Sequence, residues 1–169
     1  YCVDSFGHAG TLPQILRKCG FDAYVFMRPG PHEKALPANV FWWQAPDGSR
    51  ILAFRIAGAY TTREADQEAH ILAAVAAKPD ALDAPMCFFG VGNHGGGPTR
   101  AQIENVRAVA AAHPELDIRF SAPDLYFAEI TGQTTALPAV AGETLPQYYA
   151  RLRIAFKRQL EQKPAPEDP

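Results

Sequence analysis

Three groups of polar residues in this sequence have side chains that can do chemistry: Asp4 with His8, Arg28 with His32 and Glu33, and Asn93 with His94. A carboxylate and an imidazole four residues apart can both reach one metal ion, but two ligands leave its coordination shell incomplete. The first pair also fits a simpler arrangement, in which Asp4 caps the following loop and His8 bonds to backbone. Spacing alone leaves both interpretations open.

The third group lies in a glycine-dense loop, residues 92–98, which reads GNHGGGP. Three consecutive glycines cost backbone entropy, so they are expected where the chain takes a positive φ or lets a ligand approach closely. The loop leads into a predicted helix, whose N-terminus suits an anion. It lacks the lysine of a phosphate-binding loop and does not fit the dinucleotide fingerprint. A sugar or a metal-bound substrate is therefore a better ligand than a nucleotide, and a tight structural turn is the alternative.

The elements that would position the first two groups follow a strand–helix–strand order. Residues 1–3 are predicted to end a buried strand with Asp4 at its C-terminal tip, residues 12–19 to form a helix, and residues 22–27 a second strand. Thr11 before the helix and Gly20 after it are typical of helix ends. This order is typical of an α/β fold, in which functional groups gather at the C-terminal ends of strands.

A β-hairpin is predicted next, from residues 40–44 and 49–56 joined by the turn Pro46-Asp47-Gly48. Leu52 and Phe54 alternate with Ala53 and Arg55, a pattern that predicts one buried face.

The second half of the chain continues the alternation of helices and strands. Helices are predicted over residues 63–78, 100–112 and 123–130, and strands over residues 85–90 and 117–120. The first two helices are predicted to bury an apolar face each, made of Ala65, Ala69, Leu72 and Ala76 in one and Ile103, Val106 and Ala110 in the other. Residues 131–146 are predicted as a loop, residues 145–160 as an amphipathic helix, and residues 164–169 as a frayed tail.

Composition indicates a soluble globular protein. The chain has 169 residues, 47% of them hydrophobic and 20% charged, with a formal charge of −2. We therefore expect no nucleic-acid or membrane partner. Cys2, Cys19 and Cys87 form an odd count without metal-type spacing, which favours a reducing, cytoplasmic location. The chain begins at Tyr1, in an apolar stretch, so we expect its true N-terminus to be missing; homo-oligomerisation is left open.

Ordered motifs over about residues 1–130 resemble one known family. The stretch Asp4-Ser5-Phe6-Gly7-His8, followed by Leu12-Pro13-Gln14-Ile15-Leu16 and Gly20, resembles the nucleophile segment of the glycoside hydrolase family 38 α-mannosidases. Phe41-Trp42-Trp43 with Asp47-Gly48-Ser49 resembles that family's next block, and residues 90–99 resemble its glycine-rich block, especially in bacterial members. The resemblance identifies an internal piece of the N-terminal catalytic domain.

The resemblance implies part of a seven-stranded β/α barrel-like catalytic domain of the glycoside hydrolase/deacetylase type, with one Zn²⁺. It implies hydrolysis of terminal α-D-mannosides in oligosaccharides, with retention of configuration. Asp4 would be both the nucleophile and a zinc ligand. An ionised carboxylate can form the glycosyl-enzyme intermediate that retaining enzymes need, and a metal can orient the sugar hydroxyls.

The general acid/base is less direct to assign, because many family members carry an Asp in the glycine-rich block, where this chain has Asn93 and His94. Histidine can exchange a proton near neutral pH and asparagine cannot, so His94 is predicted in or near that role. Otherwise His94 binds substrate or another Asp acts, and Asn93 is predicted to contact substrate.

Three further residues are predicted to contact substrate or support the site. Arg28 falls where family members place a basic residue near the sugar, with an ion pair to Glu33 as the alternative. Trp43 can stack on a sugar face, although a buried hairpin tryptophan is the commoner case. His8 is predicted to contact the substrate or the metal shell, or to support Asp4 from behind. His32, His70 and His113 carry no motif and are expected to be solvated.

The chain also departs from the family pattern. Members carry a His-x-Asp zinc pair before the equivalent of Tyr1 and another zinc histidine beyond the equivalent of Pro169. We therefore expect this polypeptide alone to bind zinc weakly and to be inactive. Residues 1–140 are predicted as part of the catalytic barrel, and residues 141–169 as a divergent helix and disordered tail. A sugar-binding remnant without catalysis is the alternative function; a metal-dependent deacetylase would leave the hairpin and the glycine block unexplained.

Overall fold

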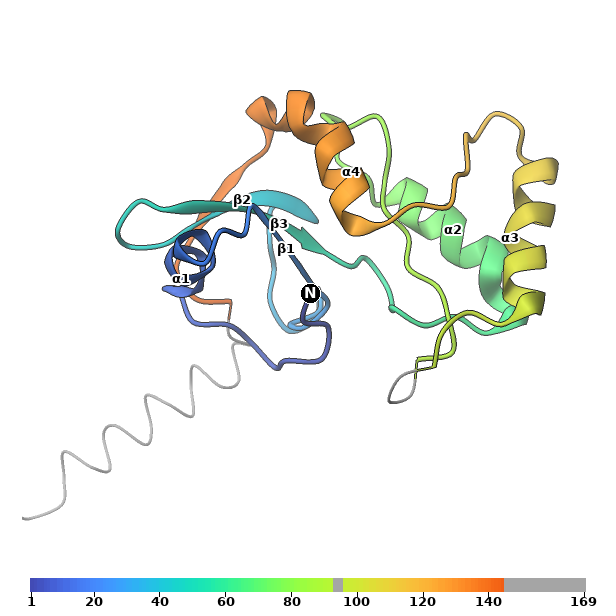
Figure 1. Cartoon of the computed structure of the whole chain (residues 1–169), viewed down its shortest axis with the longest axis horizontal. Coiled ribbons are helices and arrows are strands. Elements are labelled where there is room, and N and C mark those ends of the chain that lie inside the picture. The colour runs from blue at the N-terminus through green and yellow to red at the C-terminus, as the bar shows by residue number, and fades with distance from the viewer. Residues whose placement is uncertain (93–95, 145–169) are drawn as a thin grey trace, which may run out of the picture.

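The computed structural model describes residues 1–92 and 96–144. It shows a mixed α/β fold with a four-stranded sheet and a separate pair of helices (Figure 1). The elements in chain order are α1 (Leu12–Lys18), β1 (Ala23–Phe26), β2 (Val40–Gln44), β3 (Arg50–Arg55), the 3₁₀ helix η1 (Glu64–Asp66), α2 (Gln67–Ala76), α3 (Arg100–Ala112), α4 (Pro123–Ile130), the 3₁₀ helix η2 (Thr131–Ala136) and β4 (Ala139–Ala141).

The strands lie in the order β1-β3-β2-β4. β3 pairs with β1 in parallel and with β2 in antiparallel, and β2 pairs with β4 in parallel. On the outer side of β1, Cys2 forms a parallel bridge with Phe26, so the first residues of the chain extend the sheet. The predicted strand end at residues 1–3 is thus present as a single bridge, and the carboxyl ends of this segment and of β1 lie side by side.

The sheet is buried on both faces, because α1 and α4 cover opposite sides (Figure 1). Residues 51–56 are all buried, so the expectation of one buried face in the hairpin was wrong. One face packs Val25, Leu52 and Phe54 against α4, and the other packs Phe26 and Trp43 toward α1.

The buried positions of the sheet include one charged side chain, Arg55, which is only 4% exposed. Its guanidinium donates to Asn39 Oδ1 at 3.2 and 3.3 Å and to the carbonyl oxygen of Lys34 at 2.8 Å. These bonds explain how a charged residue can occupy a buried position at the end of β3.

The helices α2 and α3 pack on each other in a second region, around Ile71, Val106 and Val109. The predicted bounds of α3 are confirmed, and so is the burial of Val106 on its predicted apolar face. The face predicted for α2 was wrong, because Gln67 and Ile71 are buried there while Leu72 is 38% exposed. Ile71 lies on the side of α2 that meets Val106 and Val109 of α3, whereas Leu72 lies on the outer side.

Two predicted strands, residues 85–90 and 117–120, are not strands in the structure. Cys87, Phe89 and Ile118 instead pack against the α2–α3 core. Their apolar patterns are therefore satisfied by contact with helices and not by pairing in a sheet. In contrast, β4 and η2 lie in a stretch predicted as a loop. The helix predicted over residues 145–160 lies outside the described residues.

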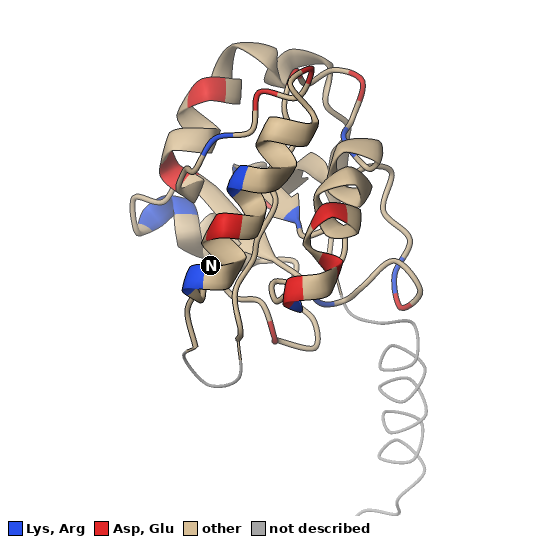
Figure 2. Cartoon of the chain, turned by 90° about the vertical axis from the view of Figure 1, so that its right-hand side faces the viewer, with Lys and Arg blue, Asp and Glu red and all other residues tan. Residues whose placement is uncertain are grey.

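Within the described ranges, no helix combines the length and the apolar character needed to cross a membrane. Acidic and basic positions alternate over the side of the molecule that carries α2 and α3, without a patch of one sign (Figure 2).

Candidate functional site

Asp4 and Arg28 meet just beyond the carboxyl ends of two neighbouring parallel segments. The amide of Cys2 donates to the carbonyl of Val25 at 2.8 Å, and the amide of Arg28 donates to the carbonyl of Val3 at 3.3 Å. This pairing brings Arg28 Nε to 3.1 Å from Asp4 Oδ1, an ion pair between residues 24 positions apart. The alternative ion pair with Glu33 is not formed, because the Glu33 carboxylate accepts from the amide of Gly30 at 2.8 Å.

The carboxylate of Asp4 is accessible, with 65% of its side chain exposed. The side chain of Arg28 is 38% exposed, and its guanidinium carbon lies 4.8 Å from the centre of the Phe6 ring. Arg28 is thus held by a charge on one side and an aromatic face on another. Asp4 Oδ2 has no hydrogen-bond partner among the described residues, so this oxygen is free to react or to bind a cation.

His8 lies beneath this pair and is buried, at 5% exposure. Its Nε2 lies 3.0 Å from the carbonyl oxygen of Arg28, and its Nδ1 lies 3.2 Å from the hydroxyl of Tyr24. A carbonyl can only accept, so Nε2 carries the proton and Nδ1 accepts from Tyr24. Burial lowers the pKa of His8, against a smaller raising effect of the bond to Arg28. His8 is therefore a neutral imidazole with both nitrogens engaged, and it acts on the site through the backbone of Arg28.

Trp43 lies beside His8 and has no exposed surface. Its indole Nε1 donates to the carbonyl oxygen of Gly142 at 2.8 Å. The amide of Thr144 donates to the carbonyl of His8 at 3.0 Å. Both contacts tie residues 142–144 to the layer under Asp4 and Arg28. In this conformation Trp43 supports the site from below and offers no face to a sugar.

The glycine-rich loop is a narrow turn where the structure describes it. Gly96 donates to the carbonyl of Gly92 at 2.7 Å, and Val91 donates to the carbonyl of Gly97 at 3.2 Å. Gly92 has a φ of +71°, and a Cβ placed there would lie 2.1 Å from Cγ2 of Thr61. Glycine is thus required at position 92 by backbone angle and by close packing. Asn93 and His94, predicted as substrate contact and acid/base, lie outside the described residues.

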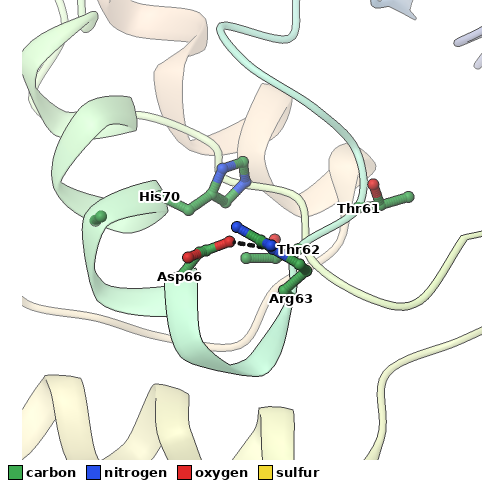
Figure 3. A pocket seen from close by; sticks show the side chains of 6 residues that line it. Thr61, Thr62, Arg63, Asp66 and His70 are labelled. Atoms are coloured by element: carbon green, nitrogen blue, oxygen red, sulfur yellow. Dashed lines mark hydrogen bonds and ion pairs between the residues drawn. The ribbon is translucent and has the colours of Figure 1, made fainter.

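A shallow pocket opens next to this loop, at the start of α2 (Figure 3). It is lined by Thr61, Thr62, Arg63, Asp66, Ala69 and His70. Arg63 is engaged with Asp66 at 2.6 Å, and His70 Nε2 lies 2.8 Å from the carbonyl oxygen of Phe88. His70 is half-buried, so the expectation that it is solvated was wrong.

No group of three or more histidine, cysteine, aspartate or glutamate side chains converges within residues 1–92 and 96–144. At this site Asp4 offers an accessible carboxylate, whereas both ring nitrogens of the neighbouring His8 are engaged in hydrogen bonds. The described part of the chain thus does not make a metal centre by itself.

Sequence reasoning missed Phe6 and Tyr24, which position Arg28 and His8. Phe6 lies inside the motif around Asp4, so its place in the sequence could have indicated a role at the site. Tyr24 reads as an ordinary strand residue, and only the packing of β1 shows that it meets His8.

A family model and several curated relatives match this chain, and they point to the same family. Residues 1–151 match the model described as "Glycosyl hydrolases family 38 N-terminal domain". "Alpha-mannosidase G" of Dictyostelium discoideum is 28% identical over 146 residues, which cover 85% of this chain and 13% of that protein. "Alpha-mannosidase 2C1" of Homo sapiens is 27% identical over 144 residues, covering 83% of this chain and 14% of that protein. The chain thus spans a small part of these curated relatives.

A solved structure shows the same fold. The crystal structure of an alpha-mannosidase from Enterococcus faecalis V583 superposes with a TM-score of 0.67 at 21% identity. The match covers 83% of this chain and 17% of that chain. The sheet and helices described above therefore occur within a larger protein, and the seven-stranded barrel stays a prediction for the whole.

Proposed function

Because this chain belongs to glycosyl hydrolase family 38, we propose that it forms part of the catalytic domain of an enzyme that hydrolyses terminal α-D-mannosides with retention. The observation that carries the proposal is the placement of Asp4. Its carboxylate stands accessible at the end of a strand, oriented by Arg28 and open at Oδ2. A retaining glycosidase needs such a carboxylate to attack the anomeric carbon and form a glycosyl-enzyme intermediate.

Arg28 supports this role in two ways. Its guanidinium, with Nε 3.1 Å from Asp4 Oδ1, holds the carboxylate in place by an ion pair. Its partial exposure also lets the guanidinium donate to a sugar hydroxyl next to the reacting centre. We therefore assign Arg28 to orienting both nucleophile and substrate, with His8 fixing the backbone at Arg28 from below.

We propose Asp4 as one ligand of a zinc ion whose remaining ligands come from the rest of the protein. The fit rests on the chemistry of a single exposed carboxylate, since no group of three or more histidine, cysteine, aspartate or glutamate side chains converges among the described residues. Bound there, zinc would hold sugar hydroxyls and favour a distorted ring. Proton transfer to the leaving oxygen is assigned to the glycine-rich loop, with His94 as the candidate.

The test uses the full-length protein and an aryl α-mannoside. Asp4→Asn keeps the shape of the side chain but removes the nucleophile, so kcat should fall by about 10³-fold or more. Asp22→Asn is the matched control, because Asp22 is another exposed aspartate paired with an arginine, Arg17. It should leave turnover unchanged. Proton NMR of the first product should show the α-anomer.

Three results would count against the proposal in different ways. A β-anomer as first product would exclude retention. Full activity after exhaustive chelation would exclude zinc. A full-length protein that binds mannosides without turnover would instead support the sugar-binding remnant.

A further inference from the structure

The two ends of the glycine-rich loop are tied to one side chain. At the entry, the carbonyl of Gly90 accepts from the amide of Thr62 at 2.9 Å. At the exit, Thr99 begins α3 as its N-cap. Between Thr62 and Thr99 lies Gln102, which is 2% exposed.

The carboxamide of Gln102 bonds at both of its atoms. Oε1 accepts from the amide of Thr99 at 3.0 Å, and Nε2 donates to the carbonyl of Thr62. The backbone amide of Gln102 in turn donates to Thr99 Oγ1 at 3.0 Å, which completes a capping box. A capping box alone would fix the helix start. The additional bond to Thr62 connects the start of α3 to the segment around Thr62, whose backbone amide is bonded to Gly90.

Two backbone hydrogen bonds close the neck of the loop, from the amide of Gly96 to Gly92 and from the amide of Val91 to Gly97. Glycines 95–97 contribute no side chain that could pack, and glycine carries the largest backbone entropy of any residue. The Gly90–Thr62–Gln102–Thr99 chain of contacts joins this neck to the start of α3.

We propose that Gln102 is a positioning residue for catalysis, which holds the neck of the glycine-rich loop against the start of α3. This proposal rests on the proposed function, because it gives the loop the proton-transfer role. Gln102 itself touches no substrate, and its effect passes through Thr62 and Thr99.

The second buried glutamine of this region provides a matched control. Gln67, in the first turn of α2, is also 2% exposed, but neither of its amide atoms has a hydrogen-bond partner in the part of the chain that is described. Gln102→Met and Gln67→Met are therefore the same change at equal burial, with and without the link to the loop.

The first measurement is hydrogen exchange by mass spectrometry on the full-length protein. Gln102→Met should speed exchange in peptides covering residues 90–99 by about tenfold, while Gln67→Met should not. Equal exchange of these peptides in Gln102→Met and wild type would overturn the proposal, whether or not the protein is a mannosidase.

The second measurement is kcat/KM on two mannosides that differ in leaving group. A dinitrophenyl leaving group departs without protonation, whereas a sugar leaving group needs the general acid. Gln102→Met should lose at least about tenfold more on the sugar substrate. A merely structural role would lower the folded fraction and reduce both values equally, and equal loss would overturn the proposal. No turnover by the wild type would instead reject the proposed function and leave the exchange experiment decisive.

Gln102→Glu gives a variant for the case that Gln102→Met does not fold. When protonated, its carboxyl can accept from Thr99 and donate to Thr62, as the amide does. When ionised, it can still accept from Thr99 but can no longer donate to the carbonyl of Thr62, and its charge would be buried, so its folded pKa should be raised. The exchange of residues 90–99 relative to wild type should therefore approach the wild-type rate as pH falls below the raised pKa and diverge as pH rises. A difference that does not change with pH would contradict the proposed link.

Discussion

The sheet region and the α2–α3 region are built on different interactions. The sheet holds a continuous aromatic layer of Tyr24, Phe26, Phe41 and Trp43, with centroid separations of 6.1 to 6.5 Å between neighbouring rings. The α2–α3 region buries three aliphatic residues and, beside them, the polar side chains of Gln67 and Gln102. Figure 1 shows the two regions side by side, with α4 between them and nearer the sheet.

This difference matches what each region has to hold. The sheet carries Asp4 and Arg28 at strand ends, where packing on both faces leaves little freedom. The helical region carries a loop without packing side chains, whose ends are fixed by directed hydrogen bonds. Loss of apolar volume should therefore damage the first region globally, whereas loss of one bond or one glycine should damage the second locally.

The largest effect is expected for Trp43→Ala. Removal of a fully buried indole and of its bond to Gly142 should lower the free energy of unfolding by about 3–5 kcal/mol. Trp42→Ala is the matched control, because Trp42 is the neighbouring tryptophan, is only partly buried, and donates to Thr134 at 3.1 Å. Its loss should be clearly smaller. Chemical denaturation of the full-length protein compares the two, and equal losses would contradict the special role of the layer under His8.

A smaller but more local effect is expected for Gly92→Ala. The positive φ of Gly92 costs alanine about 1–2 kcal/mol, and the new Cβ would meet Thr61. Because the loop can shift without unfolding the sheet, activity on a mannoside should fall by more than tenfold while the thermal midpoint changes little.

Gly97→Ala is the control for this substitution, since nothing lies within 4 Å of a Cβ at Gly97. Wild-type activity in Gly92→Ala, or equal losses in both variants, would show that the loop does not need the described backbone path.

How well the sequence predicts each region follows from the range of the interactions that build it. The start of α3 was predictable because Thr99 and Gln102 are three residues apart and satisfy each other locally. The hairpin of β2 and β3 was predictable because the turn at Pro46-Asp47-Gly48 joins its strands directly. These features depend on neighbours along the chain.

Features that depend on distant neighbours were missed. β4 consists of Ala139–Ala141, which has little strand propensity of its own, and its pairing with Trp42 and Trp43 decides its state. The pair of Asp4 with Arg28 likewise required the register of residues 1–3 on β1, which no local pattern specifies. The sequence motif around Asp4 was enough to predict its chemical role. That Arg28 is the residue that orients Asp4 is visible only in the folded structure.

The smallest effects are expected from two histidines whose pKa values are shifted in opposite directions. These effects also separate the two regions most directly. Burial lowers the pKa of His8, whereas hydrogen bonds that His113 donates to Glu68 and Glu115 raise the pKa of His113. A lowered folded pKa means that the unfolded chain binds more protons, so the contribution of His8 should be lost as pH falls through about 6.5. A raised folded pKa means the reverse, so the contribution of His113 is present below about 6.5 and lost as pH rises through its folded pKa.

The measurement is histidine C2 hydrogen exchange by mass spectrometry, which titrates each imidazole in the full-length protein. His8 should titrate below 6.5 and His113 above it. Glu68→Gln should lower the titration midpoint of His113, because it removes the carboxylate 2.8 Å from Nε2, and should leave that of His8 unchanged. Since the two histidines answer to different surroundings, an equal displacement of both midpoints by this single substitution would mean that the sheet and the α2–α3 region do not respond as separate units.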